Sequence, residues 1–109
     1  MTMTEWLTVP DLVDLLGSTP SRIRRLIEDR HLPGTRRDGV LVVPAEFLRD
    51  GAVIPEIQGT AILLADAGFS ADEIVNWLLE PEPSIGDTPI AALRAGRKSF
   101  VRRVAQSLA

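Results

Sequence analysis

The sequence predicts a mainly α-helical fold with one short β-hairpin, followed by a small helical domain. Within the first 30 residues, apolar side chains recur at helical spacing between helix-capping residues. An Asp38-Gly39 pair then separates two short segments without helical spacing, which is typical of a tight hairpin. From residue 57 onward the pattern is helical again. We therefore expect a first domain at residues 1–52 and a helical domain at residues 53–109 that can pack on the first.

The first helix is expected to begin after Thr8, whose hydroxyl is a suitable N-cap. Asp11, three residues later, can act as the acidic partner in a capping box, and Gly17 is a typical helix end. The apolar face of this helix would consist of Val9, Leu12, Val13, Leu15 and Leu16.

A second helix is expected at about residues 19–30, because Ser18 or Thr19 can cap it and Pro20 suits its first position. The sequence Leu32-Pro33-Gly34 would close this helix. Its inward side chains would be Ile23, Leu26 and Ile27.

A hairpin is expected at about residues 35–43, because an Asp-Gly pair readily adopts the positive φ angles of a type I′ turn. Pro44 would end the second strand, since it cannot donate a backbone hydrogen bond to a neighbouring strand. Residues 45–48 would form a helical turn.

Four more helices are expected in the second half of the chain. Ser70 and Glu73 form a capping box before the second of them, and Thr88 caps the third. Trp77 is expected to pack between the last three helices, and Leu108 to belong to the apolar stripe of the last one. The expected limits are residues 57–67, about 71–79, 89–95 and about 97–108.

The charge is strongly segregated along the chain, although the net charge is only −3. Residues 18–37 carry a net charge of +4 and residues 94–109 carry +5 with no acidic residue. Residues 38–93 carry −9. Because a phosphate backbone attracts concentrated blocks of positive charge, this pattern favours a polyanionic partner.

Two short helices followed by a hairpin form the plan of a winged helix-turn-helix, and the first basic block falls on its second helix and wing. A helix fits the major groove of double-stranded DNA, where its N-terminal residues reach the base edges first. We therefore expect a recognition helix at about residues 19–30 and a wing at about residues 35–43, with two arginines at the tip of the hairpin. The candidate DNA-binding residues are Ser18, Thr19, Ser21, Arg22 and Arg25 on the helix, and Arg36 and Arg37 on the wing.

A plainer interpretation of the same residues stays open. Arginines on a short helix are often a solvated face, and Arg24 and Glu28 have the spacing of a helical ion pair. His31 fits the end of a helix, where the dipole favours a cation. The basic last helix could contact phosphate, cover an acidic partner surface or merely balance residues 38–93.

The sequence lacks the residues that several functional classes require. The chain has no Cys and one His, so disulfides, thiolate metal sites and histidine-based metal sites are not expected. No nucleophile motif or phosphate-binding glycine loop is present, and Glu80, Glu82 and Asp87 fit a solvated loop. We therefore expect no enzyme activity and no cofactor. The N-terminus lacks the features of a signal peptide and no apolar run could cross a membrane, so we expect a soluble, cytoplasmic protein.

The segment from Trp6 to Leu48 resembles the N-terminal winged helix of the MerR and excisionase type. This resemblance implies DNA binding, but the long dimerisation helix and cysteine sensor of MerR proteins are missing. The matching positions are Leu7-Thr8-Val9, Leu15-Leu16-Gly17, Ile23, Leu26-Ile27 and Leu32-Pro33.

The whole chain resembles a small actinobacterial family of winged-helix DNA-binding proteins with a helical C-terminal domain of uncertain role. This resemblance implies DNA binding and a part in regulation. It is carried by Ala67-Gly68-Phe69, Glu73-Ile74, Trp77-Leu78, Pro81-Glu82-Pro83-Ser84, Pro89-Ile90, Ala92-Leu93 and Val101-Arg102-Arg103.

The tail from Asn76 to Ala109 is also similar to the C-terminal region of Xre/ParS-type antitoxins. The shared features are a Trp-Leu pair before a proline loop, a Thr-Pro helix start, a glycine and a final amphipathic helix. This resemblance implies a protein partner, so the alternative function is an antitoxin-like or adaptor protein. The sequence allows either a monomer or a homodimer.

Overall fold

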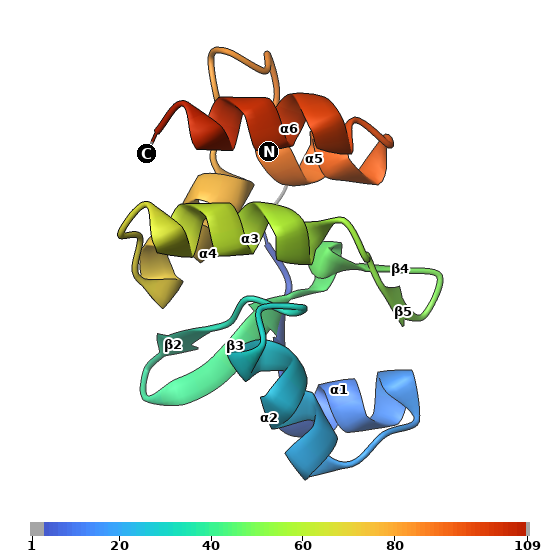
Figure 1. Ribbon diagram of the computed structural model, residues 1–109. Coiled ribbons are helices and arrows are strands. Elements are labelled where there is room, and N and C mark those ends of the chain that lie inside the picture. Colours follow the sequence, from blue (N-terminus) through green and yellow to red (C-terminus); the bar gives the residue numbers. More distant parts are fainter. Residues whose placement is uncertain (1–3, 109) are drawn as a thin grey trace.

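The computed structural model describes residues 4–108 and confirms a mainly α-helical fold with a small antiparallel sheet (Figure 1). Helices α1 and α2 lie at one end of the molecule, α5 and α6 lie at the other, and α3 lies between them. The elements are β1 (Trp6–Thr8), α1 (Val9–Leu16), α2 (Pro20–Glu28), β2 (Thr35–Arg37), β3 (Val40–Pro44), the 3-10 turn η1 (Ala45–Phe47), β4 (Leu48–Arg49), β5 (Ala52–Val53), α3 (Ile57–Asp66), α4 (Ala71–Leu79), α5 (Pro89–Arg94) and α6 (Lys98–Gln106).

Helix α1 begins and ends where its capping residues predict. The backbone N–H of Asp11 donates to Thr8 Oγ1 at 3.3 Å, and the N–H of Thr8 donates to Asp11 Oδ2 at 2.9 Å, which completes a capping box. Gly17 closes the helix in the left-handed conformation with φ of 59°.

Helix α2 is capped by Thr19 and has Pro20 in its first turn, as expected, but it ends at Glu28 rather than near residue 30. Asp29 is the C-cap residue, and Arg30 adopts a left-handed φ of 65° that turns the chain away. Glycine usually occupies this position after a helix, and its absence explains why the sequence suggested a longer helix.

The hairpin is confirmed, but it belongs to a three-stranded sheet with the order β1-β3-β2. Asp38 and Gly39 have φ angles of 53° and 79°, as a type I′ turn requires. Strand β1 was not predicted, because its three residues lead directly into the cap of α1. It pairs with β3 through Leu7 opposite Val43, and Leu7 is buried.

A second small hairpin, β4–β5, was also missed. Its turn is formed by Asp50 and Gly51, with φ angles of 54° and 74°, so the Asp-Gly signal of the wing occurs twice in the chain. Each strand has only two residues, too few to show an alternating pattern. Only the Asp-Gly turn residues could have indicated this hairpin from the sequence.

The helices of the second half lie close to their expected limits, and the Ser70–Glu73 capping box is present. Two details of their packing differ from expectation. Trp77 was expected on the buried face of α4 with Ile74 and Leu78, but it is only partly buried where it packs against the core, whereas Val75 is fully buried. Leu108 lies beyond the end of α6 and is 42% exposed, so it does not extend the apolar stripe.

One hydrophobic core runs through both halves of the chain. Leu12 and Ile23 from the first half and Leu64 and Val101 from the second are fully buried in the same cluster, with Phe47 near the middle of the sequence. Burying a side chain of this size contributes about 1.5–3 kcal/mol. The two halves therefore stabilise each other.

Polar contacts reinforce the junction between the halves. Arg94 Nη1 donates to the carbonyl oxygens of Glu46 at 2.9 Å and Leu48 at 2.7 Å, and Arg49 Nη1 donates to the carbonyl of Arg94 at 2.7 Å. These bonds join η1 and β4 to the end of α5. Arg94 therefore makes structural contacts, although it belongs to the second basic block.

Replacing Arg30 by glycine should stabilise the protein. Glycine adopts the left-handed conformation without the steric cost of a side chain, so Arg30→Gly should raise the free energy of unfolding by up to about 1 kcal/mol. The matched control is Arg24→Gly, an exposed arginine inside α2, which should lower it by about 1 kcal/mol. Urea unfolding followed by circular dichroism measures both values, and changes of the same sign would contradict the prediction.

The capping box of α4 should make stability depend on pH. Hydrogen bonds from the Ser70 backbone N–H and side chain lower the pKa of Glu73 below its ordinary 4.5. The carboxylate thus stabilises the fold above the unfolded-state pKa, and this contribution is lost as the pH falls through the folded-state pKa. Stability differences between the wild type and Glu73→Gln, measured by urea unfolding, should shrink from about pH 6 to about pH 3. A constant difference would contradict this assignment.

Candidate nucleic-acid interface

The N-terminal half of α2 presents polar and basic side chains to solvent. Ser21, Arg22 and Arg25 are exposed, whereas Ile23 between them is fully buried and anchors the helix in the core. Arg22 and Arg25 are three residues apart, so they project from neighbouring positions on one side of the helix. This side of α2 can therefore present two guanidinium groups and a hydroxyl to a partner.

The two capping candidates have different roles. Thr19 Oγ1 accepts a hydrogen bond from the N–H of Arg22 at 3.3 Å and lies 3.4 Å from Ser21 Oγ, so it begins the helix. Ser18 is half-buried, and its backbone N–H donates to the carbonyl of Val13 at 3.1 Å. Thr19 remains exposed on the outer side of the molecule, but Ser18 is less accessible.

The wing arginines lie in β2, beside the turn rather than at its tip. Both Arg36 and Arg37 are exposed, but the turn itself is formed by Asp38 and Gly39. The expectation that arginines occupy the tip is therefore corrected. The predicted turn at Asp38 and Gly39 is confirmed, so only the placement of the arginines at the tip changes.

An aromatic residue that the sequence analysis missed supports the wing. The guanidinium carbon of Arg37 lies 4.5 Å from the centre of the Trp6 ring, within the range of a cation–π interaction. Arg36 Nη1 donates a long hydrogen bond of 3.4 Å to the carbonyl of Gly39. Trp6 comes from β1, so its contact with the wing depends on the unpredicted third strand.

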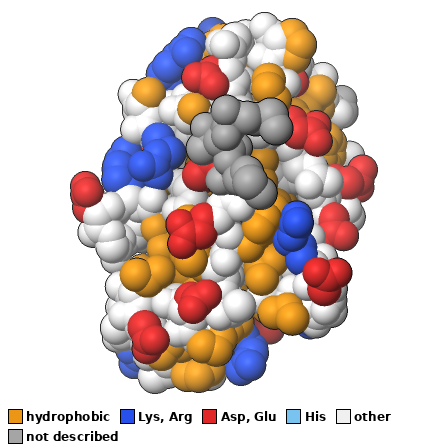
Figure 2. All heavy atoms as spheres, turned by 180° about the vertical axis from the view of Figure 1, so that it is seen from behind, with side chains coloured by type: hydrophobic (Ala, Val, Ile, Leu, Met, Phe, Trp, Pro, Cys, Tyr) orange, Lys and Arg blue, Asp and Glu red, His pale blue; other side chains and the backbone are white. Residues whose placement is uncertain are grey.

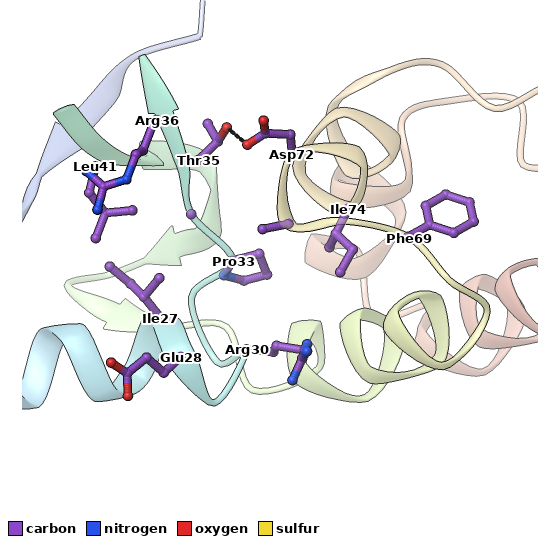
Figure 3. A pocket seen from close by; sticks show the side chains of 12 residues that line it. Ile27, Glu28, Arg30, Pro33, Thr35, Arg36, Leu41, Phe69, Asp72 and Ile74 are labelled. Atoms are coloured by element: carbon purple, nitrogen blue, oxygen red, sulfur yellow. Dashed lines mark hydrogen bonds between the residues drawn. The ribbon is translucent and has the colours of Figure 1, made fainter. Parts of the chain in front are cut away.

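A cleft of about 440 Å³ lies between the winged half and the helical half (Figure 3). Ile27, Pro33 and Leu41 form one wall, and Phe69 and Ile74 belong to the other. The hydroxyl of Thr35 donates to the carboxylate of Asp72 across one edge, which joins β2 to the first turn of α4. Glu28, Arg30 and Arg36 also line the cleft, so α2 and the wing are neighbours there.

The end of α2 is also tied to α3. Gln58 Nε2 donates to the carbonyl of Asp29 at 3.0 Å and lies 3.1 Å from His31 Nε2. His31 thus lies past the end of the helix and contacts the second half of the chain. Together with the Thr35–Asp72 bond, this contact holds both α2 and the wing against the helical half.

The face seen from behind the view of Figure 1 carries mixed charge. Seen from behind, the basic side chains lie in separate groups interspersed with acidic ones, and hydrophobic side chains fill much of the lower half (Figure 2). A phosphate backbone would meet both signs of charge on that face. The concentrated basic side chains of α2 therefore remain the better candidate interface.

Residues 4–108 contain no group of three His, Asp or Glu side chains that could hold a metal ion. Over the same residues, every helix is too short or too polar to cross a bilayer.

Comparisons with known proteins agree with this geometry. Residues 2–48 match the family described as the winged helix-turn-helix domain of DNA-binding protein Rv2175c, and residues 54–109 match the Rv2175c C-terminal domain of unknown function. DNA-binding protein Rv2175c of Mycobacterium tuberculosis (strain ATCC 25618 / H37Rv) is 32% identical over 114 residues, covering 93% of this chain and 78% of the relative.

The solved structure described as the NMR structure of Rv2175c superimposes with a TM-score of 0.86 at 30% identity, covering 96% of this chain and 81% of that one. These matches support a small winged-helix family, but they do not extend to the MerR, excisionase or Xre/ParS types. The chain belongs to the Rv2175c family, with the winged helix-turn-helix domain in its first half and the family's C-terminal domain in its second.

Proposed function

We propose that this protein binds double-stranded DNA through α2 and the wing and acts as a transcriptional regulator or nucleoid-associated factor. The observation that carries the proposal is the exposed side of α2, where Arg22 and Arg25 flank the buried Ile23. The match of residues 2–48 to a DNA-binding winged helix-turn-helix supports it.

In this proposal the N-terminal half of α2 enters the major groove. Arg22 and Arg25 contact base edges or phosphates, because a guanidinium group can bond either. Thr19 and Ser21 add hydroxyl groups near the helix N-terminus, where the backbone N–H groups and the helix dipole favour a phosphate. Ser18 lies next to this surface and contributes through its partly exposed side chain.

The wing contacts the DNA backbone or minor groove through Arg36 and Arg37. Stacking on Trp6 restricts Arg37, so less conformational entropy is lost when that guanidinium meets a phosphate. Asp38 at the turn would be repelled by phosphate, which favours an approach along β2 rather than directly onto the tip.

We also propose the division of the chain at residues 52 and 53. The two family matches, at residues 2–48 and 54–109, support this boundary. DNA recognition belongs to the first domain, while the second holds α2 and the wing in place through Gln58 and Asp72.

Fluorescence anisotropy of a labelled mixed-sequence duplex, repeated over a series of salt concentrations, tests the proposed function. The wild type should bind with an affinity that falls steeply with salt, because binding releases counterions. The variant Arg22→Ala/Arg25→Ala should bind several-fold or more weakly. If both arginines contact phosphate, the slope of log affinity against log salt should become shallower by about 1.8.

The matched control is Asn76→Asp/Ser84→Asp, which changes the net charge by the same amount at exposed sites on α4 and the following loop. It should bind nearly as well as the wild type. Circular dichroism and thermal unfolding of both variants report whether the fold is intact. Wild-type affinity in a folded Arg22→Ala/Arg25→Ala variant would exclude α2 as the DNA-contacting helix.

A further inference from the structure

The second basic block extends from the end of α5 through α6, and the structure shows which of its side chains remain available to a partner. Arg94 is bonded to backbone carbonyls of η1 and β4. The guanidinium group of Arg102 lies against Gly59 of α3, where a β-carbon would collide with it. Three exposed cations are left, and they are Arg97, Lys98 and Arg103.

The surface around these cations has the composition of a phosphate-binding surface. No Asp or Glu occurs between Thr88 and Leu108. The other exposed residues of α6 and its C-cap are Ser99, Gln106 and Ser107, whose side chains are common partners of phosphate oxygens. Arg97 lies 4.7 Å from the centre of the Phe100 ring, which holds one cation at the start of the helix.

A protein partner fits this surface less well than a polyanion. Stable protein interfaces are anchored by buried aromatic or other large apolar side chains at their centre. Here the exposed positions of α6 are polar or charged, and Leu108 lies past its end. Phosphate contacts need no such anchor, because their affinity comes from charge and counterion release.

The α6 surface cannot easily share a duplex with α2. Helix α6 lies at the end of the molecule opposite α1 and the start of α2, with α3 between them, and the longest dimension of the chain is 36 Å (Figure 1). Double-stranded DNA has a persistence length of about 150 base pairs, so it does not fold back around a protein of this size. Exposed Ile62 and Asp66 on α3 also offer no continuous basic path between the two surfaces.

We propose that α6 is a second DNA-binding surface that contacts the phosphate backbone of a different duplex, so that one molecule bridges two DNA segments. Arg97, Lys98 and Arg103 supply the charge, and the binding is independent of sequence. The proposal rests on the proposed function for the first duplex only. The contact at α6 is separate and can be measured by itself.

The experiment compares four proteins: the wild type, Arg22→Ala/Arg25→Ala, Lys98→Ala/Arg103→Ala, and the variant with all four changes. Lys98 and Arg103 are exposed, so their removal should leave the fold intact, which circular dichroism and thermal unfolding check. Light scattering gives the oligomeric state, because a dimer could bridge through two copies of α2.

Direct binding is measured first, by anisotropy at low salt. Arg22→Ala/Arg25→Ala should retain weak binding through the wing and α6, and removing Lys98 and Arg103 from it should make the slope of log affinity against log salt shallower by about 1.8, as expected for two phosphate contacts. The variant with all four changes should bind several-fold more weakly than Arg22→Ala/Arg25→Ala, with only the contacts of the wing and Arg97 remaining. If those two variants bind equally, α6 does not contact DNA and the proposal is overturned.

Bridging is measured with one duplex fixed to beads and a second, fluorescent duplex in solution. The wild type and the charge-matched control Asn76→Asp/Ser84→Asp should capture the second duplex. Lys98→Ala/Arg103→Ala should still bind the fixed duplex but capture at least about tenfold less of the second, because each lost phosphate contact weakens binding. Unchanged capture by this variant, or no capture by a wild type that binds the fixed duplex, would overturn the proposal.

The same data separate this proposal from the proposed function. If Arg22→Ala/Arg25→Ala binds like the wild type while Lys98→Ala/Arg103→Ala loses binding, the assignment of α2 fails and the α6 surface stands. If the wild type binds no duplex at low salt, both fail.

Discussion

The continuous hydrophobic core is the constraint on which the rest of the structure depends. Both halves contribute to a single core, since the cluster that contains Leu12 and Ile23 also contains Ile57, Leu64 and Val101. A small domain buries only a modest share of its surface, and sharing one core among 109 residues increases that share. The positions of α2 and the wing are therefore set by the whole chain.

This dependence gives the helical half a physical role in presenting the candidate interface. Helix α2 has only nine residues, a length at which an isolated helix is marginal in water. Packing of Ile23 stabilises its middle, and the bond from Gln58 to the carbonyl of Asp29 satisfies a group at its end. The bond between Thr35 and Asp72 fixes the base of the wing in the same way.

Local chemistry made much of the fold predictable from the sequence. Thr8, Ser70 and Thr88 each cap the helix that they were expected to cap, and Thr19 is one of the two residues expected to cap α2, because an N-cap bond spans only three residues. The Asp38-Gly39 turn was equally clear. In contrast, β1 has no local signal, since a strand of three residues is stabilised by pairing with β3, more than 30 residues away in the chain.

The same distinction applies to the candidate interface. The exposure of Ser21, Arg22 and Arg25 follows from helical spacing around Ile23, so the sequence was sufficient to place them. The stacking of Arg37 on Trp6 and the packing of Arg102 against Gly59 depend on elements that are distant in sequence. The number of basic residues in a segment does not show which cations face solvent and which pack against other residues. The left-handed Arg30 was unpredictable for a different reason, because its residue type disfavours the conformation it adopts.

The cap of α2 limits how the proposed DNA-reading surface could change during evolution. The hydroxyl of Thr19 both starts the helix and lies on the proposed reading surface, so one atom serves folding and recognition. Most replacements at this position would lose about 1 kcal/mol of stability before any effect on binding. Serine and asparagine keep the cap, and aspartate keeps it while repelling phosphate. New specificities should therefore arise more readily at positions 21, 22 and 25, because the side chains there do not cap the helix.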